Sequence, residues 1–367
     1  NAVTLIANQV GVSGGNIGTA ALPIQTQATS LVFSGEATGD VFINEANGAN
    51  FQGTTASGNI VLVSTGAGNL VNNGNTTTTG TVTISTFDGD ITRVGGGFIL
   101  GSTANLTAGG ADGDIGQLGN PLQVDGTANL NVSAGGTGDI FISETLGANV
   151  SASSGSGRIE LNTPSGDWNI VNATYATGLG GNISNTGIST AGDVFITTGS
   201  GAITDGNGAS TNVAADDAVL IATTGIGATG ALETSVNRIE AQTDTGGIFI
   251  NEANSLTIGG ISPTVGLNVT TSGDVVVLSG SLTIAEDIST ISNVLLDSTG
   301  TITETTGAVQ NAALLTTDSV GGQTLNGANT VLSFNANNTG SGDVSMTNTA
   351  DPLTIVRISN APGNTTV

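Results

Sequence analysis

The sequence contains no cysteine, no histidine and no lysine among its 367 residues. Without histidine and cysteine, there can be no Ser-His-Asp triad, no thiolate nucleophile and no zinc site built from nitrogen and sulfur ligands. Without lysine, Schiff-base chemistry and a phosphate-binding P-loop lysine are also excluded. We therefore expect a protein that is not an enzyme.

Basic residues are nearly absent as well, since four arginines face 28 acidic residues and the formal net charge is -24. Such a charge repels nucleic-acid phosphates and anionic lipid surfaces. No stretch approaches the roughly 20 continuous apolar residues of a membrane helix. We expect neither a nucleic-acid partner nor direct membrane insertion, and the charge itself favours solubility and opposes sideways aggregation.

The sequence has short apolar runs, three to five residues long, which alternate with Thr, Ser and Asn and are separated by some of the 58 glycines. Alternation of this kind is typical of β-strands, and no window carries a helical apolar period. The sequence therefore predicts an all-β protein with almost no helix.

Internal repeats organise the chain. Residues 39–45, 138–144 and 246–252 share the wording Gly-x-(Val/Ile)-Phe-Ile-x-Glu. Each closes a larger unit that begins with Ile-Gly, and the large repeats start near residues 17, 115, 226 and 302. A single repeat of this kind cannot bury its apolar face alone, and a core forms only when neighbouring repeats stack on it. We expect residues 1–367 to form a single continuous β-solenoid.

Similar strands return every 19 to 27 residues, which fits a parallel β-helix in which each coil stacks on the next. The crossover rule for parallel strands predicts that the helix is right-handed. With roughly 20 residues per coil and about 4.8 Å between strands, the chain would form roughly 18 coils and an elongated rod about 85 Å long.

The shortened motif Gly-x-(Val/Ile) assigns the two faces of each strand. The residue two positions after the glycine is apolar in every copy and should point into the core, because side chains alternate along a strand. These inward residues are Val41, Ile60, Ile91, Ile115, Ile140, Ile159, Trp168, Ile183, Val194, Ile203, Ile248, Val275, Ile302 and Val344.

The next position should point outward, and four copies place phenylalanine there: Phe42, Phe141, Phe195 and Phe249. Exposed aromatic side chains are candidates for lateral or partner contacts. The alternative interpretation is that each ring covers a local flank, or that the coil bends and takes the ring inside.

Charged residues offer few candidates for a catalytic site. We expect the acids Glu45, Glu144, Glu252 and Glu304 on the outside, in coils several turns apart, whereas a polysaccharide-degrading site needs clustered carboxylates. Two arginines lie two residues before a glutamate in the same strand. We expect the pairs Arg158–Glu160 and Arg238–Glu240 to form surface ion pairs of small energy.

Aspartate often follows the motif glycine, at Asp40, Asp90, Asp114, Asp139, Asp167, Asp193, Asp274 and Asp343. Aspartate is a preferred turn residue because its side chain can bond nearby backbone. Calcium binding is the alternative, but the spacing matches neither the nonapeptide calcium repeat nor an EF-hand. We expect no cofactor.

The repeat wording, with Leu-Thr-Ile-Gly-Gly following at residues 256–260, resembles the repeat region of filamentous haemagglutinin-like adhesins exported by two-partner secretion. The resemblance covers most of the chain loosely and is strongest at residues 17–48, 115–150 and 226–280. It implies a right-handed β-helical shaft in an extracellular fibre or adhesin at the surface of a Gram-negative-type bacterium. The family's secretion domain and receptor-binding module are not recognisable, so we expect a segment of shaft.

Three classes of function remain open. The first is a structural shaft that associates with itself end to end or continues in a giant polypeptide, because residues 1–12 and 356–367 do not predict a capping helix. The second is a carbohydrate-binding module that uses exposed Phe42, Phe141 and Phe249, with cell-surface glycans or proteins as partners. The third and remotest is a β-helical polysaccharide-degrading enzyme.

Overall fold

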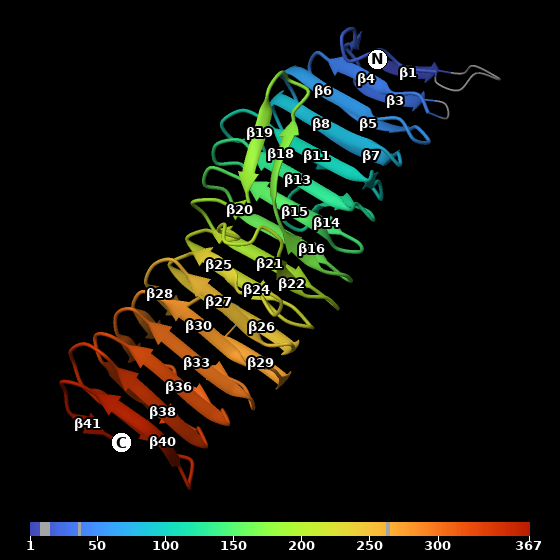
Figure 1. The fold of residues 1–367 in the computed structure, drawn as a ribbon. Coiled ribbons are helices and arrows are strands. Elements are labelled where there is room, and N and C mark those ends of the chain that lie inside the picture. Colours follow the sequence, from blue (N-terminus) through green and yellow to red (C-terminus); the bar gives the residue numbers. More distant parts are fainter. Residues whose placement is uncertain (8–14, 36–37, 262–264) are drawn as a thin grey trace. The chain divides into compact units, whose positions relative to one another are not determined.

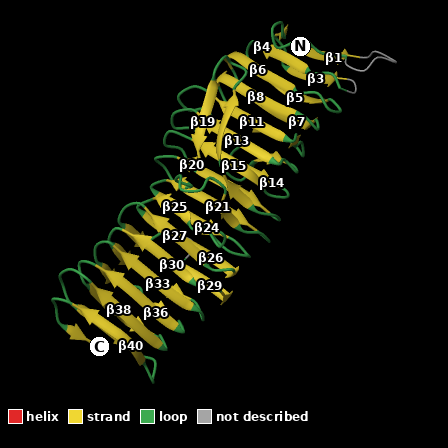
Figure 2. Cartoon of the chain, in the orientation of Figure 1, coloured by secondary structure: helices red, strands yellow, loops and turns green. Residues whose placement is uncertain are grey.

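The computed structural model describes residues 1–7, 15–35, 38–261 and 265–367. These residues form strands, turns and loops, with no helix among them (Figure 2), which confirms the prediction of an all-β protein. Contacts within the chain divide it into two compact units, Asn1–Asp193 (unit 1) and Val194–Val367 (unit 2).

Unit 1 is built from short strands, most of them two to six residues long (Figure 1). They are β1 (Ala2–Ala7), β2 (Ile24–Thr26), β3 (Ser30–Gly35), β4 (Val41–Glu45), β5 (Ala49–Thr54), β6 (Ile60–Ala67), β7 (Leu70–Thr77), β8 (Thr81–Asp88), β9 (Ile91–Arg93), β10 (Ile99–Leu100), β11 (Thr103–Ala108), β12 (Leu122–Val124), β13 (Asn129–Ala134), β14 (Ile140–Glu144), β15 (Ala148–Ser153), β16 (Ile159–Thr163), β17 (Trp168–Ile170), β18 (Asn172–Ala176), β19 (Asn182–Thr186) and β20 (Ile188–Ser189).

Unit 2 has the same construction. Its strands are β21 (Val194–Thr198), β22 (Ile203–Asp205), β23 (Val213–Ala214), β24 (Asp217–Ile221), β25 (Leu232–Ser235), β26 (Arg238–Thr245), β27 (Ile248–Glu252), β28 (Leu256–Ile258), β29 (Leu267–Ser272), β30 (Val275–Ser279), β31 (Leu282–Ile284), β32 (Ile288–Ser289), β33 (Asn293–Ser298), β34 (Ile302–Glu304), β35 (Val309–Gln310), β36 (Leu314–Ser319), β37 (Gln323–Asn329), β38 (Ser333–Asn338), β39 (Val344–Asn348), β40 (Thr354–Asn360) and β41 (Thr365–Thr366).

The strands of the coils pair in parallel with the equivalent strands of the next turn, which confirms a parallel β-solenoid. In unit 1, β4, β6, β8, β11, β13 and β15 pair in that order. In unit 2, the corresponding series is β27, β30, β33, β36, β38 and β40. Parallel pairing over such short distances along the chain requires each coil to return to the same face.

The described residues make about 16 turns, slightly fewer than the roughly 18 expected. The difference arises because many turns are longer than 20 residues. Val41 pairs with Ile60, 19 residues along the chain, but Ala104 pairs with Leu130, 26 residues along. Handedness and the continuity of one solenoid over residues 1–367 stay predictions.

The core is built as the motif predicts. Thirteen of the fourteen predicted inward residues are buried, and Trp168 has no exposed surface. The exception is Ile183, which is partly exposed. It lies in β19, which pairs antiparallel with β18 in a hairpin rather than with a neighbouring coil. The prediction for Ile183 was therefore wrong, because Gly181 belongs to the turn of a hairpin and not to a repeat.

The Ile-Gly that opens the first three large repeats also has a structural reason. Gly116 adopts a φ of +74°, and a Cβ atom at this position would lie 2.1 Å from the carbonyl oxygen of Phe141. The same approach is made by Gly18 to the Phe42 carbonyl and by Gly227 to the Phe249 carbonyl. Only glycine allows the backbone to come this close in a left-handed conformation. The Ile-Gly that opens a repeat is thus packed against the phenylalanine of the motif that closes it.

Candidate functional site

The four predicted outward phenylalanines do not share one environment. Phe42, Phe195 and Phe249 are partly exposed, as period-two alternation predicts. Phe141 follows the same alternation but only 5 % of its surface is exposed. Phe141 therefore does not present its ring at the surface. Partner contacts of Phe42, Phe195 and Phe249 stay predictions.

Phe42 lies in a row of outward side chains that crosses unit 1. Residues in register on neighbouring strands define two such rows. The phenylalanine row contains Phe42, Val61, Thr83, Asn105, Asn131 and Ser151, and the asparagine row contains Asn44, Val63, Ser85, Thr107, Ser133 and Ser153.

The hairpin of β18 and β19 lies across the strands that carry these rows (Figure 1). Asn185 in β19 donates from Nδ2 to the Val132 carbonyl at 2.9 Å, and its Oδ1 accepts from the Ser153 hydroxyl at 2.8 Å. The Ser85 hydroxyl donates to the carbonyl of Thr177, at the other end of the hairpin. Because the hairpin covers them, outward residues such as Ser85 and Ser151 have no exposed surface.

Polar side chains continue the interface from coil to coil. Asn131 donates to the Oδ1 of Asn105 at 2.9 Å, and Ser151 donates to the Oδ1 of Asn131 at 3.1 Å. Tyr175 is buried above Thr107 and Ser133, and burial raises the pKa of its phenol to about 12. The hydrogen bonds of Asn185 fix the position of the hairpin, because a buried polar group needs its partner.

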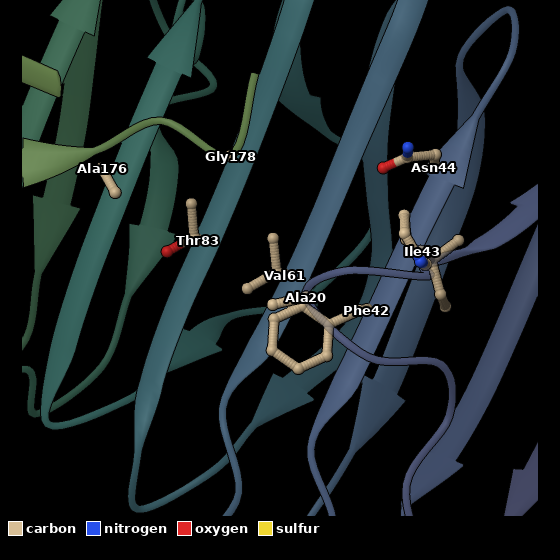
Figure 3. Close-up of a pocket in the computed structure, with 9 residues that line it drawn as sticks. Ala20, Phe42, Ile43, Asn44, Val61, Thr83, Ala176 and Gly178 are labelled. Atoms are coloured by element: carbon tan, nitrogen blue, oxygen red, sulfur yellow. The ribbon is translucent and has the colours of Figure 1, made fainter. Parts of the chain in front are cut away.

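A cavity of about 310 Å³ opens at the tip of the hairpin (Figure 3). Its floor is the apolar end of the phenylalanine row, Phe42 and Val61, with Thr83 beside the hairpin turn. Gly178 forms part of the opposite wall with a φ of +78°. A Cβ atom on Gly178 would lie 2.9 Å from Cγ2 of Val63, so a side chain there would lift the turn away. The remaining lining residues are Ala20, Pro23, Ile43, Asn44 and Ala176.

The acids expected on the outside are buried, and that prediction was wrong. Glu45, Glu144, Glu252 and Glu304 are between 0 and 7 % exposed. Alternation explains the result for the repeated motif, since Glu45 is in phase with inward Val41 and Ile43.

Each motif glutamate joins two successive corners of the solenoid, where a corner is the bend that follows a strand within a coil. The Glu45 carboxylate accepts from Ala28 N at 3.0 Å, from the Thr26 hydroxyl at 2.6 Å, and from Ala46 N at 3.0 Å. Glu252 repeats the arrangement in unit 2, with Val236 N at 3.0 Å and Asn254 N at 2.9 Å. Hydrogen bonds from several N–H groups stabilise a buried carboxylate. These residues therefore join successive turns of the solenoid.

Burial raises the pKa of two of these acids. For Glu144, desolvation raises the pKa while N–H donors, including Leu146 N at 2.7 Å, oppose the shift. For Glu304, desolvation again dominates over donation from Gly327 N at 2.7 Å and Asn329 Nδ2 at 3.0 Å. Both acids are therefore more easily protonated in the folded chain than in the unfolded chain.

One of the two predicted arginine pairs is confirmed. Arg158 and Glu160 form an ion pair of 2.7 Å, with both side chains about a third exposed. Arg238 forms an ion pair with Asp217, across neighbouring strands. Glu240 is fully buried and accepts from Ile261 N at 2.6 Å, so the prediction that Glu240 lies at the surface was wrong.

The aspartates that follow the motif glycines bond the next turn. Asp40 accepts from Asn59 N at 2.7 Å, and Asp139 accepts from Arg158 N at 2.7 Å. Asp274 does the same with Asn293 N at 2.9 Å in unit 2. Their side chains thus join coils, a more specific role than the local turn chemistry that we expected.

Within the described part of the chain, no three His, Cys, Asp or Glu side chains are grouped in a way that could hold a metal ion. In that same part, none of the segments is a helix with the length and apolar character needed to cross a membrane.

Comparison of the sequence with protein-family models and with curated proteins finds no match, and comparison of the structure with solved structures finds none either. The fold and the residues described above therefore carry the functional argument.

Proposed function

We propose that this chain is a structural shaft, a segment of an extracellular fibre or adhesin. One observation carries the proposal: the same corner device, a buried glutamate bonded to two successive corners, recurs at Glu45, Glu144 and Glu252. A stable stack of coils needs buried groups that join each coil to the next, because each coil contacts only its neighbours.

The sequence motif of the repeats supports an extracellular location. Residues 39–45, 138–144 and 246–252 are the segments that resemble filamentous haemagglutinin-like adhesins. A chain with no cysteine also needs no particular redox environment in order to fold. We propose the surface of a Gram-negative-type bacterium as the location.

Self-association would complete the outermost coils. Ile355 in β40 is in register with Phe334, which is fully buried, yet 45 % of Ile355 is exposed. In β1, Leu5 is in register with the buried Phe33 and is itself partly exposed. Apolar residues in core register favour a covering coil, supplied by a second copy or by the same polypeptide.

Electron microscopy of the purified chain tests the shaft. We expect narrow particles at least about 75 Å long, given about 16 turns and about 4.8 Å per turn, some of them joined end to end. Ile355→Asn should shorten the joined particles, whereas Ile291→Asn, which alters a side chain that is 64 % exposed in an earlier turn, should not. Compact round particles would contradict the proposal.

A second candidate is carbohydrate binding at the cavity beside Phe42. Its volume of about 310 Å³ lies at the lower end of small-molecule sites, and it combines an aromatic ring with the polar side chains of Asn44 and Thr83. A glycan array with the chain and with Phe42→Ser tests this function, and Phe249→Ser is the matched control. Glycan binding that survives Phe42→Ser would exclude this cavity as the site.

A further inference from the structure

Unit 2 has an outer face equivalent to the face that the hairpin covers in unit 1. Its two rows are in the same register because β27 repeats the wording of β4. The phenylalanine row of unit 2 contains Phe249, Val276, Leu295, Thr316 and Asn335, and its asparagine row contains Asn251, Leu278, Asp297, Asp318 and Asn337.

This face of unit 2 is more apolar than its counterpart. Leu295 takes the place of Thr83, and Leu278 takes the place of Val63. Phe249, Leu278 and Leu295 are partly exposed, whereas Val63 and Thr83 are buried beside the hairpin. Among the described residues the hairpin of β18 and β19 is the one antiparallel strand pair, and it belongs to unit 1. Clustered, partly exposed apolar side chains mark an interaction surface.

Acidic residues border the apolar cluster. Asp297 and Asp318 are adjacent in register and replace Ser85 and Thr107 of unit 1. Asp297 lies beside Leu278 in a groove of about 210 Å³. A second groove of about 270 Å³ contains both Asp297 and Asp318. A segment that lies on the apolar cluster would therefore place its own edge against two carboxylates.

Unit 1 indicates what fits such a face, because there a two-stranded segment lies on the equivalent rows. The same hairpin from a second copy would offer Asp297 and Asp318 no counter-charge. Residues 172–186 contain no lysine or arginine, and the whole chain carries a net charge of -24. Like charges oppose association, whereas a basic segment would pair with Asp297 and Asp318.

We propose that the outer face of unit 2, with Phe249, Val276, Leu278 and Leu295 at its centre and Asp297 and Asp318 at its border, binds a β-hairpin or extended segment of a partner protein that carries apolar side chains flanked by Lys or Arg. The face adds to the proposed shaft a position at which another protein attaches. It does not depend on end-to-end assembly.

Synthetic peptides test the proposal with the full chain. The probe is a fluorescent hairpin peptide with Val, Leu and Tyr on one face and Lys and Arg at the edges, and its charge-reversed form has Glu at the same edge positions. We expect the basic peptide to bind, and its affinity to fall as salt is raised. The triple variant L295T/D297S/D318T places the residue types of Thr83, Ser85 and Thr107 of unit 1 at the three equivalent positions. It should weaken binding at least about tenfold.

Ile291→Thr removes an exposed apolar side chain away from the two rows and should leave binding unchanged. Circular dichroism and the melting temperature show whether each variant is folded, and Asp318→Thr alone provides a milder test. The proposal is overturned by equal binding of the two peptides, by no binding of either, or by unchanged binding in the folded triple variant. Dimerisation of the chain that disappears in the triple variant would identify a second copy as the occupant and would also overturn it.

Discussion

Units 1 and 2 have equivalent outer faces, which differ in their side chains and in whether a hairpin covers them. In unit 1 the rows that begin with Phe42 and Asn44 become polar within a few coils and lie under a hairpin. In unit 2 the phenylalanine row stays apolar through Leu295, and the asparagine row becomes acidic at Asp297 and Asp318. The coil architecture is shared, so the character of a face depends on a few outward residues and on what the loops insert.

The insertion that creates the hairpin leaves the stacking intact. Ala148 of β15 pairs with Trp168, whereas Ala152 of the same strand pairs with Ile188. The residues between β17 and β20 leave the coil, form β18 and β19, and return to the same neighbouring strand. A solenoid tolerates such an insertion because only the coil positions contribute to the ladder.

The largest expected effect tests what the two units share. Glu45→Ala and Glu252→Ala each remove a buried carboxylate that accepts several hydrogen bonds. Each should lower the free energy of unfolding by about 3 kcal/mol, because the N–H donors of two corners are left buried without acceptors. Urea unfolding followed by circular dichroism measures the loss.

Glu160→Ala is the matched control for the corner glutamates, because Glu160 forms a partly exposed ion pair. Its effect should stay below about 1 kcal/mol. A loss for Glu45→Ala or Glu252→Ala as small as that of the control would show that the corner device is not shared by the two units.

The next effect should be confined to unit 1. Asn185→Ala removes the bonds to the Val132 carbonyl and the Ser153 hydroxyl and should lower the free energy of unfolding by about 2 kcal/mol. Hydrogen exchange should rise in β18 and β19 and not in unit 2. Asn182→Ala alters an exposed position in the same strand and is the control. Unchanged exchange in the hairpin would mean that the polar interface does not hold it.

A smaller effect should be common to both units and depends on pH. Glu144 in unit 1 and Glu304 in unit 2 have raised pKa values because they are buried. A raised pKa means that the folded state binds protons more tightly than the unfolded state, so the stabilisation is complete below the ordinary value of 4.5 and is lost as the pH rises through the folded pKa. The melting temperature should be higher at the acidic end of this window than at neutral pH.

Glu304→Gln removes one titrating group and should flatten part of this pH dependence. Asn182→Ala, at an exposed position that carries no titrating group, is the control and should leave the slope unchanged. A melting temperature that falls steadily as the pH drops from neutral would contradict the assignment.

The smallest expected effect distinguishes the two faces. Leu295→Thr gives unit 2 the residue that unit 1 has at the equivalent position and should change the free energy of unfolding by less than about 0.5 kcal/mol, because Leu295 is partly exposed. Binding of a hydrophobic dye should nevertheless decrease. A loss of several kcal/mol would mean that Leu295 belongs to the core and that the face is not available.

Sequence alone was sufficient for the coil architecture because the alternation and the repeat wording point to the same fold. Val41, Ile140 and Ile248 were assigned to the core from one rule, and all three are fully buried. The predicted outward position of Glu45 was wrong because a charged side chain is expected at the surface, whereas the alternation of Val41 and Ile43 places it inside. The donors that make its burial possible, such as Ala28 N, lie in another coil and cannot be read from the local sequence.

The amino-acid sequence does contain a local signal for the hairpin of β18 and β19. Two runs of β-type residues around Tyr175 and Ile183 are separated by Thr-Gly-Leu-Gly-Gly, a glycine-rich connection of hairpin length. Its cover over Ser85 and Asn131 could not be predicted, because those residues are about fifty to ninety positions away and read as ordinary outward positions. Phe141 shows the same limit, since alternation gives a direction and not what lies above the ring.

The shaft itself is tested most directly by immunogold electron microscopy of the cells that make this chain, with antibodies raised against unit 1 and against unit 2. We predict that both antibodies label fibres outside the cell surface. Label confined to the cell interior, or spread over the envelope without fibres, would contradict the proposal that the chain is an extracellular structural shaft.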